Sequence, residues 1–220
     1  TMSGAVGGTT ALTDLTITTD VLTAPAITLA TNGALSNTNG GASEITGIIG
    51  GSGVTLTKAG AGTLTLSGAN AYTGATHIDA GTLKLTGSLS TSTDVVMSGV
   101  AVWDLQSAQT VATLTMASGN SITNTAGTSS LTVNGASTLA NSITTSGAQT
   151  YSGAVSLGAN TTVTASSASF GSTIDSGSTG YYSLSVQAPT ISITDAVGAT
   201  KRLDNLTLNG SASLAGTTFV

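Results

Sequence analysis

The groups that could do acid–base chemistry in this chain are nine carboxylates and a single histidine. The carboxylates are Asp14, Asp20, Glu44, Asp79, Asp94, Asp104, Asp175, Asp195 and Asp204. Glycoside hydrolysis needs two carboxyl groups about 5 to 10 Å apart, and folding could bring together a pair such as Asp79 and Asp104. Polysaccharide lyases would also need an Arg or Lys base, yet no charged residue lies between Leu105 and Ile174. We therefore expect no catalytic residues and no enzyme.

Metal and nucleophile chemistry lack the necessary partners. His77 is the only histidine and there is no cysteine, whereas a zinc site or a Ser/His pair needs further residues at defined places. We expect His77 to lie on an outer surface or at a corner. The stretch Gly50–Leu56 begins like the calcium nonapeptide G-G-x-G-x-D, but Thr55 stands where the carboxylate ligand belongs. We expect no metal site, no cofactor-binding residues and no cofactor.

Two further side-chain classes could bind ligands. Trp103, Tyr151, Tyr181 and Tyr182 could stack on sugars, although singly placed aromatic residues more often pack in a core or at a corner. Threonine recurs in Thr-x-Thr pairs, which ice-binding solenoids present in flat ranks. The spacing between these pairs is irregular along the sequence, which favours ordinary hydroxyl-bearing outer faces over an ice-binding plane.

The composition excludes several partners. Charged residues make up 6% of the chain, against about 25% in typical soluble domains. The four cations are Lys58, Lys84, Lys201 and Arg202, too few and too dispersed for a nucleic-acid surface or an anionic membrane. No apolar run of about 18 residues could span a bilayer, and Thr1 is not followed by a targeting signal. We expect a mature piece or a fragment of a longer protein.

The elements that would position these groups are short strands. An aliphatic–polar–aliphatic triplet recurs along the whole chain, and such alternation places the aliphatic residues on one face and the hydroxyl on the other. The triplets begin at Leu15, Ile27, Val54, Leu64, Leu83, Leu114, Leu131, Val155, Leu184, Ile191 and Leu206. No segment has a sustained helical period, so we expect little or no helix.

Turn signals and internal echoes point to stacked repeats. Asn-Gly and Gly-Gly pairs separate the triplets, and these residues tolerate positive φ. Ala5-Val6-Gly7 is echoed by Ala196-Val197-Gly198, and Ala24-Pro25 by Ala188-Pro189. A β-sandwich usually needs bulky residues for a core about 10 Å thick, but aromatic residues are 3% here. A parallel β-solenoid with a narrow aliphatic interior fits better, and a sandwich or barrel is the alternative.

Residues 53–87 show a more specific pattern. Gly60-Ala61-Gly62-Thr63-Leu64-Thr65-Leu66-Ser67-Gly68, continued by Asn70, Tyr72 and Gly81-Thr82-Leu83, resembles the autotransporter-associated β-strand repeat. Residues 149–163 resemble the repeats of filamentous-haemagglutinin-like adhesins. The resemblance implies a right-handed parallel β-helix outside the bacterial cell, and it brings no catalytic or ligand-binding residues to this sequence.

The sequence therefore predicts one elongated all-β domain over residues 1–220, a right-handed parallel β-helix of roughly ten coils and about 50 Å. We expect an extracellular or cell-surface rod supporting adhesion or biofilm cohesion, with a host or matrix glycan as a partner. A carbohydrate-active β-helix enzyme and an ice-binding solenoid remain alternatives. We expect no charged or proline-rich cap at Thr1 or Val220, so that the ends belong to a longer parent chain or pair with other copies into filaments.

Overall fold

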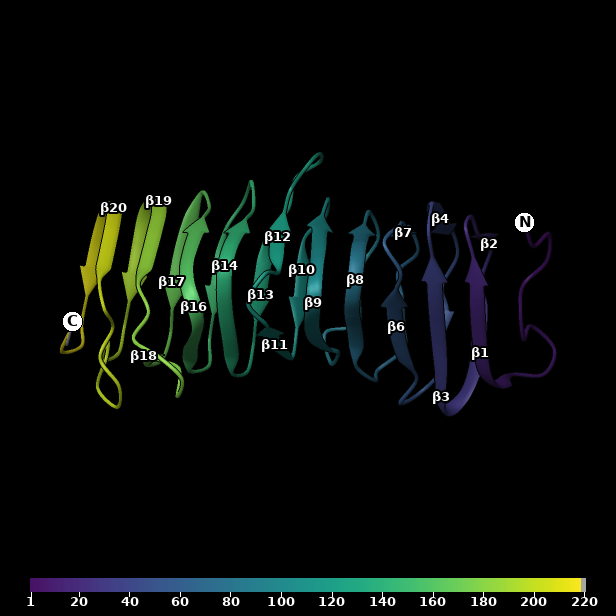
Figure 1. The fold of residues 1–220 in the computed structure, drawn as a ribbon, viewed down its shortest axis with the longest axis horizontal. Helices are drawn as coiled ribbons and strands as arrows, with labels where there is room; N and C mark the ends of the chain where they lie inside the picture. The colour runs from purple at the N-terminus through teal and green to yellow at the C-terminus, as the bar shows by residue number, and fades with distance from the viewer. Residues whose placement is uncertain (219–220) are drawn as a thin grey trace.

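The computed structural model describes residues 1–218 and shows a stack of strands whose first and last members, β1 and β20, lie at opposite ends (Figure 1). Within residues 1–218 there are no helices, and hence none able to cross a membrane. The strands are β1 Leu12–Thr19, β2 Thr23–Ala24, β3 Ile27–Asn39, β4 Ala42–Ile45, β5 Ile49–Gly50, β6 Thr55–Ala59, β7 Thr63–Leu66, β8 Thr76–Leu85, β9 Asp94–Leu105, β10 Gln109–Val111, β11 Thr113–Met116, β12 Ser121–Thr123, β13 Leu131–Val133, β14 Ser137–Thr144, β15 Gln149–Tyr151, β16 Val155–Thr164, β17 Ser167–Phe170, β18 Ile174–Ser176, β19 Leu184–Ile193 and β20 Leu206–Leu214.

All the strand pairs are parallel and join segments about one coil apart. Leu131 pairs with Gln149, 18 residues later, and Leu114 pairs with Ser137, 23 residues later. The coils therefore differ in length while the ladders stay in register. This is the predicted all-β parallel solenoid of roughly ten coils, and that prediction is confirmed.

Three ladders run along the rod, and we name them by face. Face 1 contains β1, the later part of β3, β6, β11 and β18 with the start of β8, β9, β14 and β16. Face 2 contains β2, β4, β7 and β12 with the later parts of β8, β9, β14 and β16 and the first parts of β19 and β20. Face 3 contains β5, β10, β13, β15 and β17, followed by the ends of β19 and β20.

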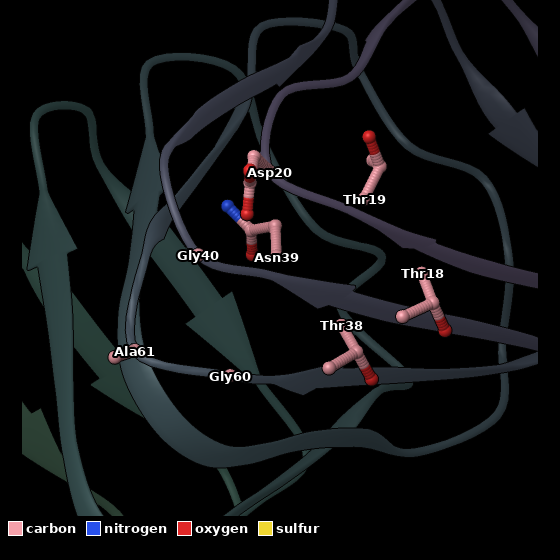
Figure 2. A pocket seen from close by; sticks show the side chains of 8 residues that line it. All are labelled: Thr18, Thr19, Asp20, Thr38, Asn39, Gly40, Gly60 and Ala61. Carbon is pink, nitrogen blue, oxygen red and sulfur yellow. The ribbon is translucent and has the colours of Figure 1, made fainter.

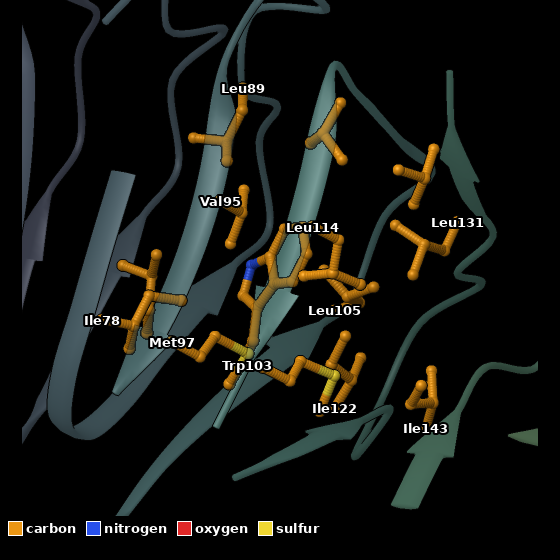
Figure 3. Close-up of a cluster of buried hydrophobic side chains, with 14 of the residues drawn as sticks. Ile78, Leu89, Val95, Met97, Trp103, Leu105, Leu114, Ile122, Leu131 and Ile143 are labelled. Carbon is orange, nitrogen blue, oxygen red and sulfur yellow. The ribbon is translucent and has the colours of Figure 1, made fainter. Parts of the chain in front are cut away.

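The core consists of ladders of inward side chains that stack coil upon coil. On face 2 the ladder is Leu64, Leu83, Trp103, Ile122, Ile143, Val163, Val186 and Leu208. Figure 3 shows the Trp103 indole among aliphatic side chains of neighbouring coils. The Trp103 Nε1 is buried without a hydrogen-bond partner, because the aliphatic stack around it offers no acceptor. Alternation along the triplets thus correctly predicts which residues face inward.

The corner between face 1 and face 2 depends on positive φ. Gly60, Gly81, Gly99, Gly119 and Asn141 all adopt it, with φ between 55° and 97°. β8 and β9 continue through Gly81 and Gly99 with a shift in register at the corner, so the strands are longer than the triplets suggested. Glycine is favoured at such corners because a Cβ there is strained and meets the backbone of the preceding coil.

The two sequence echoes behave differently in the fold. Ala24-Pro25 and Ala188-Pro189 both lead into face 3. Val6, however, bridges to Ile27 on face 3, whereas Val197 bridges to Ile174 on face 1. The same local sequence therefore serves two different faces, since it encodes a turn followed by a strand and not the place of that strand in the coil.

The exposed ladders at the two ends carry apolar side chains. Leu12 on β1 is 38% exposed and Leu214 on β20 is 42% exposed. β20 pairs with β19 along one edge, and its other edge faces no strand within residues 1–218. The expectation about a cap at Val220 lies outside the described residues.

The stacked core predicts a strong difference between neighbouring positions. Leu114 is buried and Thr115 is exposed in the same strand, β11. Leu114→Asp should lower the free energy of unfolding by about 4 kcal/mol or more, because it buries an uncompensated carboxylate. Thr115→Asp should change it by no more than about 0.5 kcal/mol. Urea unfolding followed by circular dichroism measures both, and equal effects would contradict the assigned faces.

The corner geometry predicts a similar contrast between two glycines. An alanine at Gly81 would have φ +67° and its Cβ would meet the carbonyl oxygens of Gly60 and Gly62, whereas an alanine at Gly50 meets no atom within 4 Å. Gly81→Ala should lower the thermal stability by about 1 to 3 kcal/mol, and Gly50→Ala should be close to neutral. Thermal melts of the two variants provide the comparison. A Gly81→Ala variant as stable as the parent would show that this corner does not constrain the coil.

Candidate functional site

The segment with the most specific sequence pattern contains an unusual buried group, the ammonium of Lys58. Lys58 points inward from β6 and is fully buried. Its Nζ donates hydrogen bonds to the carbonyl oxygens of Ala59 at 2.8 Å, Gly60 at 2.8 Å and Ala80 at 3.1 Å. The first two acceptors belong to its own corner and the third to the next coil. Lys58 therefore ties two successive corners between face 1 and face 2.

Burial disfavours the charged form of Lys58. Desolvation lowers its pKa from the usual 10.5 to about 8. The inward neighbours of Lys58 in the ladder are Asn37 on one side and Ile78 on the other. Both polar side-chain atoms of Asn37 are buried without partners, so two polar residues are stacked in the interior at this point.

Buried amides join the coils at other corners. Asn70 Oδ1 accepts a hydrogen bond from the Ile49 N–H at 3.0 Å, and its Nδ2 donates to the Gly68 and Ser88 carbonyls. Gln109 and Asn120 make the same kind of three-way contact. These amides satisfy backbone groups that a corner leaves outside the ladders. Sequence reasoning missed them as structural residues, although a lone Asn or Gln in the register of the aliphatic positions is a usable signal.

The carboxylates that could have formed a catalytic pair lie on different faces. Asp79 is on face 1, where its Oδ1 accepts a hydrogen bond from Ser98 Oγ at 2.6 Å. Asp104 is on face 2, in register with Lys84 and Thr123. Asp104 is 4% exposed and accepts hydrogen bonds from Thr125 and from Gln106. Both carboxylates are thus engaged in contacts between coils, and the structure does not bring them together.

Other acidic side chains play the same part. Asp14 accepts a hydrogen bond from the Ala34 N–H, Glu44 from Ser67 Oγ and Asp94 from Thr113 Oγ1. In each case the donor lies about one coil later in the chain. These three acidic side chains therefore link neighbouring coils by hydrogen bonds on the outer faces.

His77 and the glycine-rich stretch show no metal-site geometry. His77 is half-buried on the outer side of face 1, in register with Thr57 and Val96, as predicted. Thr55 is in β6 on the same face, and the positive φ of Gly51 and Gly53 serves the turn before it. Within residues 1–218 no three side chains of His, Cys, Asp or Glu gather where they could hold a metal ion.

The outward hydroxyls are better aligned than the sequence spacing suggests, because differences in coil length are absorbed at the corners. On face 2, Ser121, Ser142 and Thr162 are in register, as are Thr123, Thr144 and Thr164 in the next row. Toward the N-terminus these rows continue through Val102, Asp104 and Lys84. On face 2 the hydroxyl pairs therefore line up over three coils, and the first row continues through Ser185 and Thr207. Toward the N-terminus, apolar and charged side chains interrupt both rows. On face 3 a single row of six hydroxyls consists of Thr110, Thr132, Thr150, Ser169, Ser192 and Ser213.

A shallow hollow of about 470 Å³ lies at the corner between faces 1 and 2 in the first coils. Figure 2 shows Thr18 and Thr38 projecting from adjacent strands and Asp20 beside Asn39. The Asn39 Nδ2 already donates to the Gly41 and Thr63 carbonyls. The residues lining the hollow supply one carboxylate and no aromatic ring, so it has neither the paired acids of a hydrolase nor a stacking surface for a sugar.

Two of the four aromatic residues considered as sugar-stacking candidates are core residues. Trp103 and Tyr151 are fully buried, and Tyr151 stacks on Phe170 with ring centroids 5.2 Å apart. Burial also raises the pKa of Tyr72 and Tyr151, since it disfavours the phenolate. Tyr182 is half-buried. Only Tyr181 among the four has a ring that is largely open to solvent.

Residues 56–85, which contain Lys58, Asn70 and Tyr72, match the family model of the passenger-associated-transport-repeat. The stretch is similar to an autotransporter passenger repeat. It runs from β6 to the end of β8 and so passes once through all three faces before returning to faces 1 and 2. The resemblance of residues 53–87 is thereby confirmed, and the likeness of residues 149–163 to haemagglutinin-like adhesins stays a prediction. No curated protein and no solved structure matched the chain.

The passenger repeat and the solenoid fold together support a secreted passenger rod. The match itself covers 30 residues, from Leu56 to Leu85. The coils outside it continue the same three ladders without a break in strand direction. The side chains with unusual contacts, Lys58, Asn70, Gln109 and Asn120, lie at the corners of that stack.

The buried lysine of the passenger repeat predicts an unusual pH dependence. Its pKa is lower in the folded chain, about 8, than in the unfolded chain, so between pH 8 and 10.5 the unfolded chain binds more protons. Stability should therefore rise as the pH increases from 7 to 9.5, before ionisation of the buried tyrosines in the unfolded chain reverses the trend. Lys58→Met should remove that rise. Urea unfolding of both proteins across this range is the measurement, and parallel curves would contradict the assignment.

Proposed function

We propose that this chain is a non-catalytic rod of an autotransporter-type passenger that supports adhesion or biofilm cohesion outside the cell. The observation that carries the proposal is the position of the passenger repeat within the fold. Residues 56–85 form one segment of an uninterrupted solenoid, and neighbouring coils are built on the same ladders. Because each coil contacts only its neighbours, the shape is extended and stiff and suits a spacer.

The distribution of ionisable groups favours a structural role over catalysis. Asp79 and Asp104, the pair that sequence reasoning singled out, are held on separate faces by hydrogen bonds to neighbouring coils. The buried Lys58 is held by three carbonyl oxygens and does not reach the surface. A carbohydrate-cleaving β-helix would instead need acid and base groups converging on one open cleft.

Cohesion between copies is supported by the two terminal ladders. The outer edges of β1 and β20 face no strand within residues 1–218, and open strand edges readily pair with further strands. Leu12 and Leu214 add apolar surface at these edges. We infer that copies associate end to end through β1 and β20, with the low charge of the chain offering little repulsion. In a longer parent chain, its own coils would cover the same edges.

Two observations favour ice binding: the hydroxyl pairs that line up over three coils of face 2, and the single row of six hydroxyls on face 3. The interruption of the face 2 rows by Val102, Asp104 and Lys84 reduces the flat area that could match an ice plane. Measurement of thermal hysteresis addresses this alternative directly, and a clear freezing-point gap would favour it over the spacer function.

Electron microscopy of the purified chain at several concentrations tests the rod. Ten coils at about 4.8 Å per coil give particles about 50 Å long. We expect such rods at low concentration and filaments of the same width at high concentration. Rods that stay the same length at every concentration would be consistent with the spacer function but would contradict end-to-end association of copies. Compact globules, or turnover of any member of a polysaccharide panel, would contradict the proposal.

A further inference from the structure

The corner between face 1 and face 2 changes character near the C-terminal end. In the central coils the chain turns this corner at single residues such as Gly81 and Gly99. After β18 it instead takes residues 177–183 to reach face 2, and after Val197 it takes residues 198–205. In repeat proteins, insertions of this kind are often where binding surfaces form.

The two loops are joined into one platform. The Lys201 Nζ donates to the Gly177 carbonyl at 2.7 Å and to the Ser178 carbonyl at 2.9 Å. The Asp204 N–H donates to the Tyr182 carbonyl at 3.0 Å. These bonds connect residues more than 20 positions apart in the chain, so the loops support each other.

The base of the platform is anchored to β18. Asp175 Oδ1 accepts hydrogen bonds from the backbone N–H groups of Thr200, at 2.8 Å, and Lys201, at 3.0 Å. Ser176 Oγ accepts one from the Tyr182 N–H at 2.9 Å. These hydrogen bonds hold the backbone of both loops against β18 and so fix the starting positions of the loop side chains.

Tyr181 lies in the first of these two loops, and two cationic side chains lie near its ring. Its side chain is 56% exposed, in contrast to the buried Trp103 and Tyr151. The Lys201 Nζ lies 5.1 Å and the Arg202 Cζ 5.0 Å from the centroid of the Tyr181 ring. Two of the four cationic side chains of a chain with net charge −5 are thus gathered at one exposed aromatic ring.

We propose that Tyr181, Lys201 and Arg202 form a binding site for a saccharide that carries a carboxylate. A tyrosine ring offers an apolar surface on which the C–H face of a pyranose can pack. The Arg202 guanidinium matches a carboxylate with a planar pair of N–H donors, and Lys201 adds a second positive charge. The site gives the proposed passenger rod a glycan ligand. It rests on the proposed function only in assuming that the chain meets such a saccharide outside the cell.

The surroundings favour a saccharide over other anionic partners. β18 is paired with β16 and bridged to Val197, and β19 is paired on both edges. Within residues 1–218 the strand edge left open near the platform is the outer edge of β20, whereas Tyr181 lies just before β19, which is paired on both edges. One exposed ring and two cations provide too small a basic surface for a nucleic acid.

The test is isothermal titration of the 220-residue chain with oligogalacturonate, sialyllactose and alginate fragments, and with neutral lactose as the matched ligand. We expect binding of at least one carboxylated saccharide, weakened by salt, and little binding of lactose. Arg202→Gln and Tyr181→Ala should each weaken binding roughly tenfold or more. Tyr181→Phe should preserve it, and Lys84→Gln, on a remote coil, should not change it.

Several results would overturn the site. Binding of none of the three carboxylated saccharides at millimolar concentration would do so, as would equal binding of lactose or full affinity in both Arg202→Gln and Tyr181→Ala. Preferential binding of a poly-Glu peptide or of single-stranded DNA would assign the platform to another ligand class. Circular dichroism and electron microscopy of the same samples separate the two proposals. Rods that bind no saccharide would contradict only the binding site, whereas globular particles would contradict the proposed rod.

Discussion

The structure depends on one constraint, the parallel backbone ladder that places each residue directly over its counterpart in the next coil. Because parallel strands lie about 4.8 Å apart, a side chain that points inward must stack on another inward side chain. Ladders such as Leu64, Leu83, Trp103 and Ile122 are the result. Each inward side chain therefore has about 4.8 Å along the rod before it meets its counterpart in the next coil. Aliphatic side chains fit this spacing more readily than large aromatic rings. Trp103 is accommodated at the cost of an indole N–H without a partner.

The same constraint explains the buried polar groups. A ladder satisfies the backbone along a face, but at a corner the N–H and C=O groups turn away from their neighbours and need other partners. Asn70, Gln109 and Asn120 supply them with side-chain amides, and Lys58 supplies an ammonium. Some corners combine a positive-φ glycine with a side-chain donor, since Lys58 donates to the Gly60 carbonyl and Asn120 directly follows Gly119. The coils thus share a fold while differing in how each turn is held.

The sequence predicts the strands and the inward residues well, because alternation of aliphatic and hydroxyl residues acts over two or three positions. It predicts the outward position of His77 for the same reason. It does not predict which face a strand joins, and the Val6 and Val197 echoes show why: identical neighbours occur on face 3 and on face 1. Nor does it predict the alignment of Ser121 with Ser142, or the meeting of Tyr181 with Lys201, since both depend on how many residues each corner absorbs.

The unequal corners also bear on how such a chain can change over generations. A residue added within a strand such as β8 would turn the following inward side chains of that strand outward and the outward ones inward. Selection should therefore remove insertions and deletions within strands. A residue added at a corner is taken up outside the ladders, as the seven residues 177–183 are. Length variation should therefore collect at the corners, and a lineage could acquire new surface chemistry there while the interior stays unchanged.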